Sequence, residues 1–119
     1  MRLAFAALLM AALSAIPSTG NAKLISTLDL HRVCSARMGQ TSFIIDYASC
    51  LGYISGVADA VDETRISRGK RACVPDGMRD FEVKNIVVGY IARNPDKWHL
   101  PASAIVAEAL KNDMPDCKG

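Results

Sequence analysis

Residue types that commonly carry out nucleophilic or acid–base catalysis are sparse in this chain. His31 and His99 are its only histidines, so the paired histidines of an H-E-x-x-H zinc site are absent. His31 and Cys34 lie three residues apart and would be neighbours on a helix, which makes a nucleophilic pair geometrically feasible. A cysteine held in a disulfide cannot act as a nucleophile. The redox state of Cys34 therefore decides whether this pair can act in nucleophilic catalysis.

The acidic residues and the tryptophan give no better candidate for an active site. Asp46, Asp59, Asp62 and Glu63 are too dispersed to nominate as an acid–base pair. No Gly-rich phosphate loop follows a strand-like segment. We expect the Trp98 side chain to act as a plug that packs between helices rather than to stack against a ligand. We therefore expect no catalytic residues, no metal ligands and no cofactor, and we predict that the protein is not an enzyme.

The first residues have the order typical of a secretory signal peptide. Met1 and Arg2 give a short positive start, and residues 3–16 form an apolar run broken only by Ser14. Small residues precede a predicted cleavage site after Ala22. The run is shorter than the roughly 20 residues that a membrane-spanning helix needs. We predict that residues 1–22 are removed and that residues 23–119 form one exported domain.

Four cysteines remain in this predicted mature protein: Cys34, Cys50, Cys73 and Cys117. An even number in a short exported chain predicts a disulfide framework, whereas no two of them have the C-x-x-C spacing of a zinc site. Spacing alone leaves three pairings open. We favour Cys34–Cys50, which would join neighbouring helices, and Cys73–Cys117, which would fasten the C-terminus. The chain-entropy model gives such loops about 3 and about 4 kcal/mol of stabilisation.

The charge balance argues against two classes of partner. Without Arg2, 13 of the 14 basic residues remain beside 12 acidic ones, a formal charge of +1. Nucleic-acid binding needs a concentrated basic field, and so does attachment to an anionic membrane surface. The sequence shows no second apolar stretch that we judge long enough to span a bilayer. We therefore expect a soluble mature protein that contacts neither nucleic acid nor membrane.

The apolar periodicity is helical throughout. Ser26 and Asp29 have the spacing of a capping box, which predicts a helix from there to about Ala36. The longest periodic stretch covers residues 42–61. Its expected inward face consists of Phe43, Tyr47, Leu51, Ile54, Ala58 and Val61.

A second line on this stretch has a small residue at every fourth position: Ala48, Gly52, Gly56 and Ala60. Each glycine inside a helix costs about 1 kcal/mol relative to alanine. The compensation we expect is close approach of another helix or of a partner chain, which small side chains permit.

Residues 62–72 are polar and are predicted to form a loop, with the preceding helix fraying into it. This loop has the densest charge cluster in the chain, and loops on rigid scaffolds often carry recognition. Its basic residues are candidates for partner binding: Arg65, Arg68, Lys70 and Arg71. Asp59, just before the loop, is interpreted as a carboxylate that caps or pairs within the fold, with a direct partner contact as the alternative.

Two further helices complete the predicted bundle. Turn residues at 73–77 precede a helix over residues 80–93, whose expected inward residues are Val83, Ile86, Val87, Tyr90 and Ile91. Asn94-Pro95 ends it, and Pro101 starts a last helix to about residue 111, which should bury Ile105, Val106, Ala109 and Leu110. We predict an all-α fold, a compact bundle of four to five helices with two disulfides.

Several segments together carry a family resemblance. The run at residues 50–60 includes Gly52, Tyr53, Gly56 and Asp59, and Pro75 lies in the run C-V-P-D-G-M at residues 73–78. Residues 87–91, Asn94-Pro95, residues 104–110 and a terminal cysteine follow in order. The sequence resembles the Rap family of immunity proteins, also grouped with the Tai type, which protect bacteria against type VI secretion amidase toxins.

The resemblance implies a periplasmic helical protein, often a homodimer, that binds a peptidoglycan amidase and blocks its active-site cleft. Two positions depart from the family pattern. Arg79 and Glu82 stand where the family usually has the Thr and Gln of a capping box, and Asp116 intervenes between the last proline and the last cysteine. The named motif residues are mostly scaffold, so they do not identify the toxin contacts.

The alternative function is a periplasmic stress chaperone or another non-catalytic binding module. At about pH 2, the 13 basic residues and two histidines of the mature chain would carry a charge of about +15. Such repulsion would loosen a small core and expose apolar surface. A cell-wall enzyme is disfavoured because the sequence shows no catalytic constellation.

Overall fold

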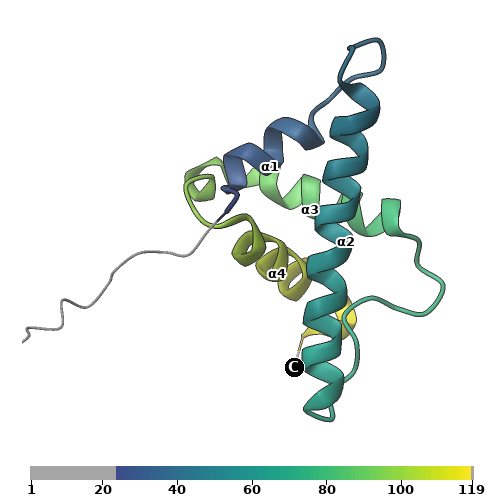
Figure 1. Cartoon of the computed structure of the whole chain (residues 1–119). Coiled ribbons are helices and arrows are strands. Elements are labelled where there is room, and N and C mark those ends of the chain that lie inside the picture. The colour runs from purple at the N-terminus through teal and green to yellow at the C-terminus, as the bar shows by residue number, and fades with distance from the viewer. Residues whose placement is uncertain (1–23, 119) are drawn as a thin grey trace, which may run out of the picture.

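The computed structural model describes residues 24–118, so the predicted signal peptide lies outside the described residues. It contains four α-helices: α1 (Thr27–Cys34), α2 (Phe43–Ser67), α3 (Asp80–Arg93) and α4 (Ala102–Asp113). Two short 3-10 turns, η1 (Pro95–Lys97) and η2 (Pro115–Cys117), follow α3 and α4. The other three helices all pack against α2, which projects beyond them at both ends (Figure 1). The predicted all-α bundle is confirmed.

The predicted capping box opens α1. The Asp29 amide donates to the Ser26 hydroxyl, and the Ser26 amide donates to the Asp29 carboxylate, both over 3.1 Å. Two amide groups that a helix start leaves without partners are thereby satisfied. The helix ends at Cys34 instead of Ala36, where the Ser35 hydroxyl donates to the His31 carbonyl over 2.7 Å.

The helix α2 extends six residues past the end predicted from periodicity. It continues through residue 67 and stops before Gly69, whose φ of +73° is in the left-handed region that favours glycine. Residues 62–67 contain neither glycine nor proline, so nothing in them breaks a helix. The prediction that the whole of residues 62–72 forms a loop is therefore wrong for its first half.

The core lies where the four helices meet. The predicted inward residues of α3 and α4 are buried, apart from the half-buried Ile86. On α2, Ile54 and Ala58 are buried as predicted, but Tyr47 is 38% exposed. Tyr47 lies near the end of α2 that projects beyond the bundle, where its ring is covered only in part, by the Lys84 ammonium of α3 at 5.1 Å from its centroid.

Both favoured disulfides are confirmed. Cys34–Cys50 joins the end of α1 to α2, and Cys73–Cys117 joins the segment after α2 to η2. Each bridge therefore links two segments of the chain that do not belong to the same helix.

The start of the described chain is fastened to the start of α4. Thr27 is fully buried, and both its amide and its hydroxyl donate to the Leu100 carbonyl, over 2.9 and 2.8 Å. Trp98 acts as the predicted plug: its indole nitrogen donates to the Ile91 carbonyl over 2.9 Å, and its ring stacks on His31 with centroids 4.2 Å apart.

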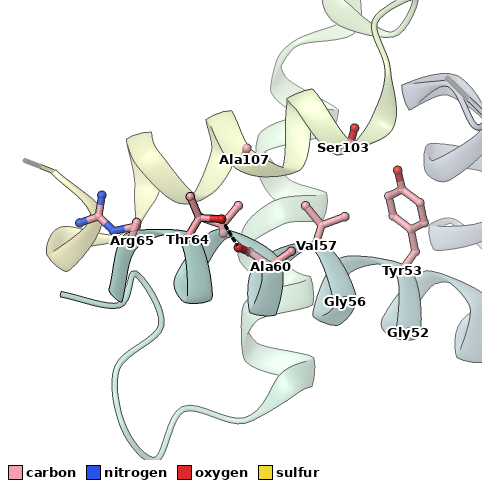
Figure 2. Close-up of a pocket in the computed structure, with 10 residues that line it drawn as sticks. Gly52, Tyr53, Gly56, Val57, Ala60, Thr64, Arg65, Ser103 and Ala107 are labelled. Atoms are coloured by element: carbon pink, nitrogen blue, oxygen red, sulfur yellow. Dashed lines mark hydrogen bonds between the residues drawn. The ribbon is translucent and has the colours of Figure 1, made fainter. Parts of the chain in front are cut away.

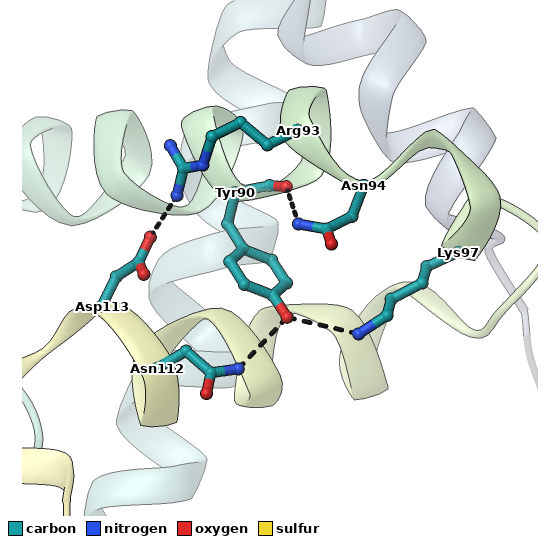
Figure 3. A network of polar contacts seen from close by, with 6 residues as sticks. All are labelled: Tyr90, Arg93, Asn94, Lys97, Asn112 and Asp113. Carbon is teal, nitrogen blue, oxygen red and sulfur yellow. Dashed lines mark hydrogen bonds and ion pairs between the residues drawn. The ribbon is translucent and has the colours of Figure 1, made fainter.

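A polar network around Tyr90 holds α3, η1 and α4 together (Figure 3). The Asn112 amide donates to the Tyr90 hydroxyl over 3.1 Å, and the Lys97 ammonium approaches the same oxygen at 3.4 Å. Lys97 also pairs with Glu108 over 2.6 Å. These contacts, with Glu108 first and Tyr90 second, raise the pKa of Lys97 above its ordinary value of 10.5.

Candidate partner-binding surface

The small-residue line of α2 faces solvent. Gly52 and Gly56 are exposed, and a Cβ atom built on either would meet no heavy atom within 4 Å. Of the two compensations that the sequence suggested, close approach by another helix of this chain is therefore absent among residues 24–118. Close approach by a partner chain remains a prediction.

An apolar groove runs along this line between α2 and α4 (Figure 2). Its volume is about 690 Å³. Tyr53 and Val57 project from α2 on the side of α4, toward Ser103 (Figure 2). The lining consists almost entirely of small or apolar residues, with one charged side chain: Gly52, Tyr53, Gly56, Val57, Ala60, Val61, Thr64, Arg65, Ser103 and Ala107.

Large apolar side chains are also exposed at the start of α2 and in the loop before it. Ile44 is 79% exposed, Ile45 is 72% exposed and Met38, in the preceding loop, is 84% exposed. Clusters of large apolar side chains in water mark interaction sites more often than isolated ones do. Periodicity did not predict this exposure, because Ile44 and Ile45 belong to neither the expected inward face nor the small-residue line of the helix.

By length and composition alone, α2 is long and apolar enough to cross a membrane. Only 17% of its most apolar 18-residue segment is buried within the protein. Our prediction that no second stretch is long enough was therefore wrong. The same helix supplies the buried Cys50, Ile54 and Ala58 to the core. Moving it into a bilayer would remove the central helix from the bundle, so its uncovered apolar face fits a protein partner better.

The predicted basic loop divides into one structural residue and three exposed ones. The Arg65 guanidinium donates to the Arg71 carbonyl over 2.8 Å and to the Asp116 carbonyl over 3.2 Å. It therefore holds the loop and the C-terminal turn onto α2. Arg68, Lys70 and Arg71 have exposed side chains, which leaves them as the candidate partner-binding residues of the loop.

The structural carboxylate near this loop is Asp62. Its two oxygens accept the amides of Cys73 and Val74, over 2.6 and 3.2 Å. Asp59, to which we had assigned a capping or pairing role, is exposed. That assignment fell one helical turn too early, because Cys73 lies eleven positions further along the chain and no local spacing points to Asp62. A partner contact for Asp59 stays a prediction.

The geometry offers no nucleophile at the His31–Cys34 pair. Cys34 is bonded to Cys50, and the His31 ring stacks on Trp98. Within residues 24–118, no three histidine, cysteine, aspartate or glutamate side chains gather in a way that could hold a metal ion. The motif residue Pro75 lies in a turn, where its carbonyl accepts the Met78 amide over 3.1 Å.

Comparison with protein families gives a match over residues 26–117 to the model of the Rap1a immunity proteins. The chain belongs to this family. The matched region begins at the N-cap of α1 and ends at the last cysteine, so it includes all four helices and both disulfides. No curated protein and no solved structure matches the chain.

Membership of the Rap1a family fits the surface described above. An immunity protein works by binding another protein, which requires a rigid exposed surface and no catalytic group. The exposed features of this disulfide-bonded bundle include the α2 groove, the isoleucines Ile44 and Ile45, and the basic side chains of Arg68, Lys70 and Arg71.

Proposed function

We propose that this protein is a periplasmic immunity protein that neutralises a peptidoglycan amidase toxin by binding it and occluding its active site, without catalysing a reaction itself. The family match over residues 26–117 is the observation that carries the proposal. A predicted signal peptide and two disulfides support an oxidising compartment. The resemblance also leads us to propose that the chain acts as a homodimer.

The test begins with the hydrolase. The proposal predicts that a small exported hydrolase with catalytic Cys and His residues is encoded beside this chain. That enzyme, purified, is incubated with peptidoglycan sacculi, and the release of soluble fragments is measured with and without the mature chain. We expect an equimolar amount of the chain to stop release. Full hydrolysis in the presence of a tenfold excess would overturn the proposal.

The exposed basic loop residues lead to a sharper version of this test. Charges at the rim of an interface mainly set the association rate, and their effect weakens with salt. We expect R68E/K70E to slow association with the amidase about tenfold at low ionic strength, with a smaller effect at high salt. The matched control is R32E/R79E, which reverses two exposed arginines on α1 and before α3, outside the loop and the apolar surface. Equal rates for both variants would remove the loop from the interface while leaving inhibition itself untouched.

The alternative, a stress chaperone, is favoured by the exposed apolar side chains of Met38, Ile44 and Ile45. In that case the protein would suppress aggregation of an acid-denatured client enzyme at about pH 2, where repulsion between its positive charges exposes more of the core. Client aggregation that proceeds at the same rate with and without the protein would eliminate this alternative.

A further inference from the structure

We infer that the groove between α2 and α4 binds a long-chain fatty acid. The acyl chain lies along the apolar part of the groove, and the carboxylate lies at its basic end, formed by Arg65, Lys70 and Lys111. This inference goes beyond the proposed function, because inhibition of a hydrolase requires no small-molecule ligand. It is therefore testable on the protein without its toxin.

The groove is lined by three rows of residues, each at steps of four residues along a helix. This spacing places side chains on one face, one above the other. Two rows belong to α2, from Gly52 to Thr64 and from Tyr53 to Arg65, and the third belongs to α4, from Ser103 to Lys111. The groove therefore follows the length of both helices.

Two of these rows end in a basic side chain at the same end of the groove. On α2, Val61 is followed one turn later by Arg65, and on α4, Ala107 is followed one turn later by Lys111. Arg65 lies at the opposite end of the groove from Tyr53 (Figure 2). An apolar trough with its charge confined to one end is complementary to an amphiphile, which has one apolar chain and one charged head group.

The basic end contains a second hollow that adjoins the groove. Its volume is about 290 Å³, and it shares Val61, Arg65 and Ala107 with the groove. Its lining also includes Lys70 and Lys111, and none of the described residues that line either hollow is acidic. In the part of the chain that the structure describes, none of the three basic side chains pairs with a carboxylate. Their charges attract an anionic head group and repel a cationic one.

The Arg65 guanidinium is held in place at this end. Its Nε and Nη2 atoms donate to the carbonyls of Arg71 and Asp116, while Nη1 donates to no other group among the described residues. A guanidinium hydrogen-bonds an ionised acceptor more strongly than a neutral one. A carboxylate in the second hollow therefore meets a fixed guanidinium donor and the ammonium groups of Lys70 and Lys111.

The dimensions of the groove match one acyl chain. A helix rises about 1.5 Å per residue, so the row from Gly52 to Thr64 is about 18 Å long. The hydrocarbon core of a bilayer is two acyl chains deep and about 30 Å thick, which gives about 15 Å for each chain. The volume of about 690 Å³ is in the range of small-molecule sites. A single fatty acid therefore fits without moving α2 out of the bundle.

The first experiment measures binding of radiolabelled myristate to the exported mature protein by equilibrium dialysis. We expect saturable binding with a Kd of about 10–100 μM. Octanoate, which is shorter by six methylene groups, should bind at least about tenfold more weakly, because each buried methylene adds affinity. Myristyltrimethylammonium has the same chain and the opposite charge, and it should also bind at least about tenfold more weakly than myristate.

The second experiment places a side chain inside the groove. Gly56→Leu should weaken myristate binding about tenfold or more, because the leucine occupies the path of the acyl chain. A Cβ atom at this position meets no heavy atom within 4 Å, so the melting curve should show an intact fold. Ala92→Leu, at an exposed position on α3, is the matched control and should bind myristate as the wild type does.

The third experiment reverses the charge of the basic end and remains informative if Gly56→Leu folds poorly. We expect K70E/K111E to weaken myristate binding about tenfold and to strengthen binding of myristyltrimethylammonium. Both lysines are exposed, so the fold should tolerate the change. R32E/R79E is the matched control, because it changes the net charge equally at exposed positions outside the groove, and it should bind myristate as the wild type does.

Three binding results would overturn the inference. They are no saturable myristate binding up to about 300 μM, equal affinity for the two oppositely charged amphiphiles, and equal myristate affinity of the wild type and K70E/K111E.

Other occupants of the groove give different results, each of which also overturns the inference. Flotation with vesicles of phosphatidylcholine and phosphatidylglycerol, without binding of monomeric myristate, would assign the groove to a membrane surface. A protein that binds no myristate and whose Gly56→Leu variant loses amidase inhibition or self-association would assign it to the toxin or to a second copy. Inhibition is measured separately, so a failure of myristate binding alone leaves the proposed function untouched.

Discussion

Single side chains near the end of α2 hold a segment that has no regular secondary structure. Asp62 accepts two backbone amides, and Arg65 donates to two backbone carbonyls. A charged group that satisfies buried or half-buried backbone groups contributes more than one that pairs with another exposed charge. The position of Cys73, and so of its disulfide, depends on Asp62.

Replacing Asp62 by Ala should destabilise the fold by about 2–3 kcal/mol, because the amides of Cys73 and Val74 lose a charged acceptor. Urea unfolding of the disulfide-intact protein, followed by circular dichroism, measures the change. Asp59→Ala is the control on the same helix, and because Asp59 is exposed we expect a change within about 0.5 kcal/mol. Equal effects for the two variants would contradict the assignment.

Polar side-chain contacts between elements gather where α3, η1 and α4 meet. The Tyr90 network joins α3 to η1 and α4 (Figure 3). Trp98, directly after η1, also donates to the Ile91 carbonyl of α3. Lys97 is the link that depends on pH, since its hydrogen bonds to Glu108 and Tyr90 raise its pKa.

The Lys97 contact should show a defined pH dependence. Because its folded-state pKa lies above the ordinary 10.5, the stability that it adds is fully present below pH 10.5 and is lost as the pH rises through the folded-state value. Melting of the wild type and of Lys97→Met between pH 8 and about 11 gives the difference. We expect the wild type to be more stable at pH 8 and the two curves to converge at the alkaline end. A constant gap across this range would contradict the contact.

The whole molecule is a small domain whose stability is of the same order as the contribution of its disulfides. The bridges span 16 and 44 residues of sequence. The first bridge anchors α2 at Cys50, and the second fastens the segment that follows α2, the helix on which the groove lies. Loss of either bridge should therefore loosen the recognition surface as well as the fold.

Removing the longer bridge should cost more than removing the shorter one. In the chain-entropy model, we expect C73S/C117S to lose about 4 kcal/mol and C34S/C50S about 3 kcal/mol relative to the wild type. Chemical denaturation of the three proteins compares them. Titration of the denatured exported protein with a thiol reagent checks the premise, and free thiols would contradict the oxidised framework.

The sequence by itself determined the features that depend on neighbouring residues. Helical periodicity gave the bundle, the bounds of α3 and the buried faces of α3 and α4, and the capping box located the start of α1. The even cysteine count predicted the framework, and the order of motifs indicated the family that the comparison then confirmed. These signals are readable because capping and amphipathicity operate within a few residues along the chain.

Only the tertiary structure decided which residues make contacts within the fold and which have exposed side chains. It assigned the carboxylate role to Asp62 in place of Asp59, separated Arg65 from the exposed basic residues, and left Gly52 and Gly56 in open space. It also showed that α2 projects beyond the bundle, so that Tyr47 is only partly covered. Periodicity states that a residue lies on a given face of a helix. Whether another element covers that face depends on contacts between segments far apart in the chain, which no local pattern encodes.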